Sequence, residues 1–201
     1  MLLNYYSQTK MAKGEALGYK TAILHFAPYD LSGRNVCPKA TKGPGGCIEI
    51  EQLKKRARSQ GYKFAVRLNG TSDLPWFKYK VEGGGSIMDL HPDVQFYDYT
   101  KVLNYLDHGK KNYHVTFSDS GTNHQDQLAA MEKGPNIAVV FKDQLPKRWR
   151  ISHGSSTNDR RVIDGDAHDL RFTDPKGVIV GLVAKGLGRK VTKNSFIKIA
   201  S

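Results

Sequence analysis

Short apolar runs separated by polar clusters recur along most of this chain. The runs are rich in β-branched and aromatic residues, and each ends abruptly in small polar or charged residues. They lie at residues 64–68, 94–97, 113–117 and 137–141. Runs of this length and composition predict β-strands. Because continuously apolar strands are typical of sheets covered on both faces, the pattern predicts a parallel sheet.

Helical spacing appears between several of these runs. Residues 48–60 repeat apolar side chains three and four positions apart, and Gly61 marks a plausible end. Shorter helices are expected at 101–107 and from about residue 122 to Glu132, and further strands at 21–27 and 178–182. Strand and helix alternate every 20 to 25 residues, roughly, which predicts an α/β fold with a mainly parallel sheet of repeated βα units.

The number of strands limits the architecture. Too few runs are present for an eight-stranded barrel, so a partial or degenerate barrel and an open doubly wound sheet both fit, and the partial barrel is the prediction. We expect residues 1–20 to be a poorly ordered lead-in and residues 21–201 to form a single α/β domain. Residues 152–160 are rich in Ser, Gly, Asn and Asp, which predicts a surface loop.

The net charge of the chain indicates what kind of partner it binds. The 201 residues include 31 Lys and Arg against 19 Asp and Glu, a formal net charge of +12. Such an excess indicates a polyanionic partner, either nucleic acid or a phosphorylated small molecule. No apolar run approaches the roughly 20 residues of a membrane helix, and no secretory signal is evident. The expected location is therefore the cytoplasm, with no membrane partner.

Two cysteines, Cys37 and Cys47, lie in a Gly- and Pro-rich stretch. Two thiols make no disulfide framework, and they cannot complete a zinc site without His or carboxylate ligands. Free thiols are the expected state in a reducing cytosol.

Several long motifs resemble a widespread family of uncharacterised bacteriophage proteins. They are Asn-Val-Cys-Pro-Lys-Ala-Thr at 35–41, Arg-Leu-Asn-Gly-Thr-Ser-Asp at 67–73, the strand and tip at 94–101, and the segments 163–172 and 177–186. The resemblance covers most of the chain from residue 19 and implies a phage protein in the cytoplasm of the infected host cell, without implying a reaction. The cysteine-containing start followed by βα units is also distantly similar to radical-SAM barrels, although two cysteines do not supply the usual three thiolates of a four-iron cluster.

Polar residues at the strand ends are the candidate site. The carboxyl ends of parallel strands share one edge of a sheet, so the four polar tips are expected to converge in one cleft. Asp73 or Asp98 would act as a general base there, and Lys101 would pair with a phosphate. The alternative for Asp73 is a helix cap, and for Asp98 and Lys101 a buried ion pair.

The remaining candidates would bind substrate. Trp76 and Tyr99 offer platforms on which a base could stack, and the others offer hydrogen-bond donors, acceptors or positive charge. This set comprises Asn69, Thr71, Ser72, Trp76, Tyr97, Tyr99, Ser118, Lys142, Arg171 and Lys185.

Asp164, Asp166 and Asp169 form the densest acidic cluster of this basic chain. Carboxylates at this spacing suit a divalent cation such as magnesium or manganese. An Asp-Gly turn with capping carboxylates is the alternative, and Arg171 could instead neutralise one of the carboxylates.

Two functions follow from these residues. The first is a phage enzyme that acts on a nucleic acid or nucleotide at the strand ends. The second is a non-enzymatic accessory protein that binds nucleic acid, and a protein that binds a host factor is a further alternative.

Overall fold

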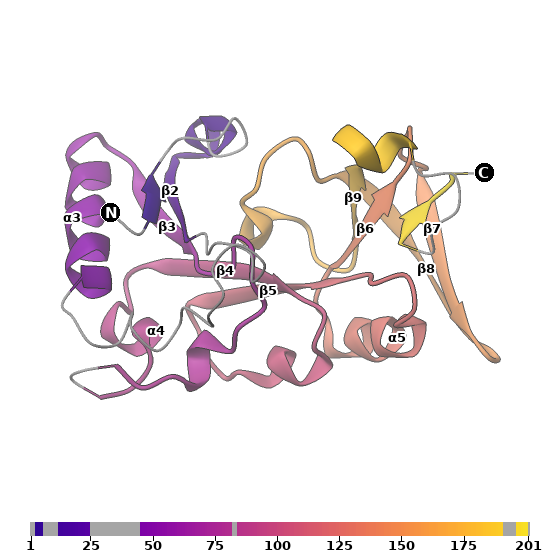
Figure 1. Ribbon diagram of the computed structural model, residues 1–201, viewed down its shortest axis with the longest axis horizontal. Helices are drawn as coiled ribbons and strands as arrows, with labels where there is room; N and C mark the ends of the chain where they lie inside the picture. The colour runs from indigo at the N-terminus through magenta and orange to yellow at the C-terminus, as the bar shows by residue number, and fades with distance from the viewer. Residues whose placement is uncertain (1–2, 6–11, 25–44, 82–83, 191–195, 201) are drawn as a thin grey trace. The chain divides into compact units, whose positions relative to one another are not determined.

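A computed structural model describes residues 3–5, 12–24, 45–81, 84–190 and 196–200 (Figure 1). Cys37 lies outside these residues. The chain divides into two compact units, the first comprising Met1–Asp98 with His108–His114 and the second Tyr99–Asp107 with Val115–Ser201. The strands β4 and β5 contribute residues to both units, and each unit is described on its own.

Four strands build the sheet of the first unit. They are, in spatial order, β1 (Leu3–Tyr5), β2 (Tyr19–Leu24), β3 (Lys63–Arg67) and β4 (Gln95–Thr100). β1 runs antiparallel to β2, whereas β2, β3 and β4 are mutually parallel. The predicted strands at 21–27 and 64–68 are confirmed as β2 and β3, and residues 25–27 lie outside the described residues. The segment expected to be a lead-in contains β1 and a 3-10 helix, Lys13–Leu17.

The helix predicted at 48–60 is also confirmed, as α3 (Gly45–Ser59). Its residues Ile50, Leu53 and Ala57 are buried, as the three- and four-residue spacing requires. The unit also contains a 3-10 helix, Trp76–Lys78, and α4 (Ile87–Leu90), whose first turn is closed by a capping box between Ser86 and Asp89.

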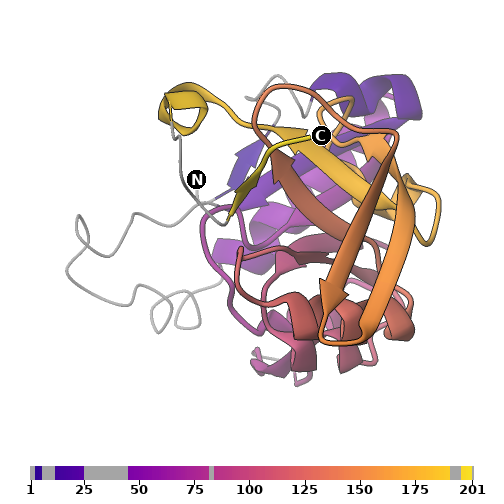
Figure 2. The ribbon, with the colours of Figure 1, turned by 90° about the vertical axis from the view of Figure 1, so that its right-hand side faces the viewer.

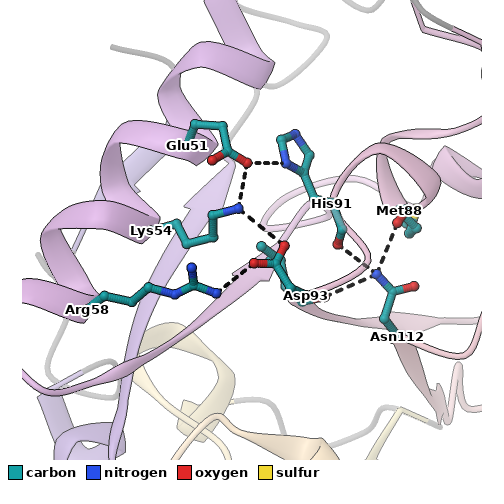
Figure 3. A network of polar contacts seen from close by, with 8 residues as sticks. Glu51, Lys54, Arg58, Met88, His91, Asp93 and Asn112 are labelled. Carbon is teal, nitrogen blue, oxygen red and sulfur yellow. Dashed lines mark hydrogen bonds and ion pairs between the residues drawn. The ribbon is translucent and has the colours of Figure 1, made fainter.

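A polar network ties α3 to the segment that leads into β4 (Figure 3). Lys54 is buried and places its Nζ 2.6 Å from Glu51 Oε1 and 3.2 Å from Asp93 Oδ1. Glu51 also lies 2.8 Å from His91 Nδ1, and Arg58 pairs with Asp93 at 2.6 Å. Hydrogen bonds and charge from Lys54 lower the pKa of Glu51. The network therefore compensates the burial of an ammonium group.

Five strands in the order β5–β6–β9–β8–β7 build the sheet of the second unit, with β10 paired to β6. Their bounds are Tyr113–Ser118 (β5), Ile137–Phe141 (β6), Arg148–His153 (β7), Ser156–Asp164 (β8), Ile179–Val183 (β9) and Ile197–Lys198 (β10). β6 pairs in parallel with β5, β9 and β10, and β9 with β8, while β7 and β8 are antiparallel. The predicted strands at 113–117, 137–141 and 178–182 are confirmed.

α5 (His124–Lys133) and the sheet enclose the core of the second unit. The buried side chains of this core include Phe117, Met131, Phe141, Ile151 and Ile179. The helix expected at 101–107 is a 3-10 helix, Leu103–Asp107, and two more 3-10 helices lie at Arg171–Thr173 and Gly186–Lys190.

The predicted partial barrel is wrong. In the described residues β1 pairs with β2 alone and β7 with β8 alone, so the mixed sheet is open. The reason lies after β6, where the chain makes an antiparallel hairpin instead of another βα unit. β9 follows that hairpin in sequence but inserts between β6 and β8, and βα repetition stops there. The distant likeness to radical-SAM proteins depended on a barrel, and the open sheet is not a barrel.

The surface loop predicted at 152–160 is also wrong, because these residues belong to the β7–β8 hairpin. A two-residue loop, Gly154 and Ser155, connects the strands, and Gly154 has φ +57°. Tight hairpin turns need positive φ, which glycine adopts without strain.

Within the described part of the chain, no helix has the length and apolar character needed to cross a bilayer.

Asn112 offers a test of how the first unit is held together. Its Nδ2 donates to the carbonyls of Met88, His91 and Val94 at 3.0–3.1 Å. We expect Asn112→Asp to lower the free energy of unfolding by about 3 kcal/mol, because it turns an oxygen toward three carbonyl oxygens. Asn112→Ala removes only the donor and should cost about half as much. Urea denaturation compares them, and equal losses would contradict this account.

Candidate functional site

Two predicted residues, Asn69 and Asp98, join the segment after β3 to β4. The strand predicted at 94–97 runs on to Thr100, so Asp98 lies within β4 and not in a loop after it. The backbone N–H of Asn69 donates to Asp98 Oδ1 at 2.7 Å, and Asn69 Nδ2 lies 3.4 Å from Asp98 Oδ2. Both side chains are buried. The structure therefore brings these two predicted residues together within the first unit, inside β4 and not at its end.

Asn69 also organises the loop that follows β3. Its Oδ1 accepts hydrogen bonds from the Ser72 hydroxyl at 2.8 Å, from the Leu74 N–H at 3.0 Å and from Trp76 Nε1 at 2.9 Å. Its Nδ2 donates to the Leu74 carbonyl at 3.0 Å. Ser72 and Trp76, predicted to bind substrate, are thus brought to Asn69 and hold the loop. Trp76 is half-buried and meets Tyr79 edge-on, with ring centroids 5.9 Å apart.

Asp98 is the most perturbed carboxyl group of this site. It is 1% exposed, and burial raises its pKa from 3.8 to about 7. The Asn69 N–H, the positive charge of Arg67 and the Tyr113 hydroxyl, 3.0 Å from Oδ2, oppose that rise, while Asp73 adds to it. Desolvation disfavours the charged form of a carboxyl group, so burial dominates here.

Tyr113 was missed by sequence reasoning. It begins β5 and is almost fully buried, and burial together with the nearby Asp98 raises the pKa of its phenol. Its ring lies 4.8 Å from that of His108 and 6.4 Å from that of Phe77. An aromatic residue at the start of a strand is ordinary in sequence, and only the strand pairing reveals its partner.

This arrangement can hold a proton near neutral pH, but its acceptor atoms are already engaged. Asn69 and Tyr113 supply donors to both Asp98 oxygens, and the carboxyl group is closed from solvent. Thr71 is exposed and Asp73 half-buried, whereas Tyr97 is fully buried within β4. The hydrogen bonds of Asp98 therefore first of all tie the segment after β3 and the start of β5 to β4.

The remaining strand-end candidates belong to the second unit. Lys101 is exposed and lies over the ring of Phe196, 5.4 Å from its centroid, and Tyr99 is half-buried. The Ser118 carbonyl accepts a hydrogen bond from Asn123 Nδ2 at 3.1 Å, and the Lys142 N–H donates to the Lys198 carbonyl at 2.8 Å.

A second buried carboxylate, Asp119, lies just beyond β5. Its Oδ2 is 2.9 Å from Lys198 Nζ, and its Oδ1 accepts hydrogen bonds from the Gly121 N–H and from Gln127 Nε2. Sequence reasoning did not single it out, although it occupies the same place after its strand as the predicted residues do. Like Asp98, it is satisfied by groups of its own unit.

Two carboxylates of the acidic cluster bind other groups of the chain. Asp164 Oδ1 accepts the Asp166 N–H at 2.8 Å, an Asx turn, and Asp166 pairs with Lys185 at 2.9 Å. Asp169 is buried. In the described residues no three carboxylate, imidazole or thiol groups are placed to hold a metal ion. The predicted divalent cation thus receives no geometric support from Asp164, Asp166 and Asp169.

Arg171 and Lys185 differ in accessibility. Arg171 is fully buried, donates to the His168 carbonyl and lies 3.3 Å from Asp174 Oδ2. Burial raises the pKa of Asp174, and the charge of Arg171 opposes that rise. Arg171 therefore neutralises Asp174, while Lys185 is exposed and paired with Asp166.

The β7–β8 hairpin presents a basic face that sequence reasoning missed. Its register pairs Arg148 with Arg161, Arg150 with Asp159 and Ser152 with Thr157. Residues opposite each other and two apart share a face of a strand pair, and all six are exposed. We call these six the outer face of the ribbon. Arg148 bonds to Asp159 at 3.0 Å, whereas Arg150 and Arg161 have no acidic partner among the described residues.

The opposite face of the ribbon packs on its own unit, beside α5 (Figure 2). Ile151 is part of the core, and Trp149 meets Phe141 edge-on at 5.1 Å. Arg160 donates to the carbonyls of Met131 and Pro135 at the end of α5, and burial lowers its pKa. The ribbon is therefore held rigidly from behind.

Asp98 makes stability depend on pH. Because its pKa is higher in the folded protein than in the unfolded chain, the folded state is favoured while Asp98 is protonated, and this contribution is lost as pH rises between 3.8 and about 7. We expect Asp98→Asn to remove that loss, so the variant should gain stability relative to the original protein across this interval. Chemical denaturation at several pH values measures the difference. A constant difference across the interval would contradict the raised pKa.

Comparison with known proteins identifies the family of this chain. No curated protein and no solved structure matches the chain. A family model described as Gene product 88 matches residues 46–198, which include the strand ends and the ribbon and exclude the motif at 35–41. This match confirms the expectation of an uncharacterised phage protein family, and it does not test the individual motifs. The chain belongs to the gene product 88 family.

Proposed function

We propose that this protein binds nucleic acid, and that the outer face of the β7–β8 ribbon is its contact surface. One observation carries the proposal: Arg148, Arg150 and Arg161 share an exposed face with a single carboxylate, Asp159. Arginine presents a planar fork of donors that suits phosphate oxygens. A net charge of +12 adds long-range attraction for a polyanion.

The contrast with the strand ends supports this choice of surface. Asp98 and Asp119 are buried and bonded to neighbours within their own units. Arg150 and Arg161 are exposed and have no acidic partner in the described part of the chain. Guanidinium groups held without counter-charges attract anions, and the rigid support behind the ribbon limits the conformational entropy lost on binding.

The enzymatic alternative rests on Asp98. A carboxyl group whose pKa is about 7 is suited to general-base catalysis and marks a candidate catalytic site. In that case the protein alters the nucleic acid or nucleotide that it binds, and Asp98 accepts a proton from the substrate or from water.

Asp98→Asn separates the enzymatic alternative from binding alone. If the protein is an enzyme, the variant should lose turnover of a labelled oligonucleotide by about a hundredfold or more, whereas an accessory protein should keep its affinity. Electrophoresis of the incubated oligonucleotide with the folded variant measures the first outcome, and fluorescence anisotropy measures the second. Unaltered oligonucleotide with the original protein would remove the enzymatic alternative for that substrate.

Salt dependence tests the proposed contact surface. We expect the original protein to bind labelled oligonucleotides with an affinity that falls steeply between about 50 and 200 mM salt. Arg150→Ala with Arg161→Ala should lower the slope of log affinity against log salt by about 2, because two phosphate contacts are lost. Arg150→Lys with Arg161→Lys should restore most of the slope.

Lys55→Ala with Lys111→Ala is the matched control. Both lysines are exposed, and both belong to the first unit, so this pair removes equal charge away from the ribbon. It should change the slope little. No binding by the original protein at low salt would refute the proposed function, and equal losses in the two double variants would refute the ribbon as its surface.

A further inference from the structure

We infer that the ribbon binds double-stranded DNA, with its outer face in the major groove. This inference rests on the proposed function and narrows it to one form of nucleic acid and one groove. The argument uses the dimensions of the ribbon, the residue types on its outer face and the residue types that this face lacks.

The dimensions fit a major groove. Six residue pairs, from Arg148 and Arg161 to His153 and Ser156, make a ribbon about 20 Å long at roughly 3.3 Å per residue. Its two strands lie about 5 Å apart. The major groove of B-form DNA is about 12 Å wide and accepts a two-stranded ribbon, whereas the minor groove, at about 6 Å, does not accept one broadside.

Over most of its length the ribbon consists of β7 and β8 alone among the described strands, because β8 pairs with β9 only at its last residues. β8 pairs with β9 only at Val162, Ile163 and Asp164, so in the described residues 156–161 pair with β7 alone. The hairpin ends at Gly154 and Ser155, whose small side chains add little bulk at the tip. One edge of residues 156–161 is thereby left unpaired in the described part of the chain, and the outer face of the strand pair is exposed.

The residue types of the outer face suit base edges and phosphates together. An arginine fork can donate two hydrogen bonds to O6 and N7 of guanine in the major groove. Ser152 and Thr157, paired with each other next to Arg150 and Asp159, add small groups that can donate and accept. Such residues, carried by paired strands, are how β-ribbon proteins contact DNA.

The absence of aromatic side chains from the outer face argues against binding of single-stranded nucleic acid. Proteins that bind single strands stack the bases on aromatic side chains. The outer face has none, because Trp149, the aromatic residue of β7, lies on the opposite face against Phe141. Duplex RNA is also excluded, because its major groove is too deep and narrow for a ribbon to enter.

The experiment compares four probes of one sequence, each roughly 20 base pairs or nucleotides long, about two turns of a duplex. They are duplex DNA, one of its single strands, duplex RNA, and duplex DNA whose cytosines carry glucosylated hydroxymethyl groups, which fill the major groove. Fluorescence anisotropy at fixed low salt gives the affinity of the full-length protein for each probe. Distamycin, a ligand that occupies the minor groove, serves as competitor on the unmodified duplex.

We expect plain duplex DNA to bind about tenfold or more tightly than the other three probes. Distamycin should leave this affinity unchanged. Arg150→Ala with Arg161→Ala should abolish most of the preference for plain over glucosylated duplex, whereas Lys55→Ala with Lys111→Ala should keep it.

Three results would overturn the inference while the proposed function stands. They are tighter binding to single strands or duplex RNA, equal binding to plain and glucosylated duplexes, and displacement by distamycin. Failure to bind any of the four probes would instead refute the proposed function itself.

Discussion

Burial of the parallel strands on both faces is the constraint on which the rest of the structure depends. In β3, β6 and β9 the buried positions carry apolar residues or glycine, as expected for strands covered on both faces. The polar groups of the candidate sites lie after strands, at Asp98 within β4, and on strands that leave the buried sheet. Asn69 and Asp119 follow β3 and β5, Asp98 is buried within β4, and the β7–β8 ribbon leaves the buried sheet.

The buried carboxyl groups and the exposed arginines are stabilised in different ways. The buried carboxyl groups of Asp98 and Asp119 are each matched by donors of their own unit, because an unmatched buried charge would cost roughly several kcal/mol. Asp98 responds by holding its proton up to about pH 7. Arg150 and Arg161 of the ribbon are exposed to water, where they need no partner to be stable. They therefore keep their positive charge available for a polyanion.

Most regular elements were predictable because their patterns are local. Ile50, Leu53 and Ala57 repeat with the helical period, and the run 137–141 is apolar throughout, so α3 and β6 follow from sequence alone. The β7–β8 hairpin was missed because Ser, Gly, Asn and Asp dominate its turn and the start of β8, a composition typical of loops. Its strand conformation depends on packing of Trp149 and Ile151 and on hydrogen bonding to a partner strand.

In the candidate site too, some features were predictable from local sequence and others were not. The chemistry of Asn69 and Asp98 could be expected from sequence, because both follow apolar runs, whereas the continuation of β4 through Asp98 to Thr100 could not. The partners were not predictable: Tyr113 lies 15 residues from Asp98, and Lys198 lies at the far end of the chain from Asp119. Composition settles the net charge and the identity of each group. Pairing between distant segments decides which charges are neutralised and which stay exposed, because burial and hydrogen bonding are properties of the folded chain.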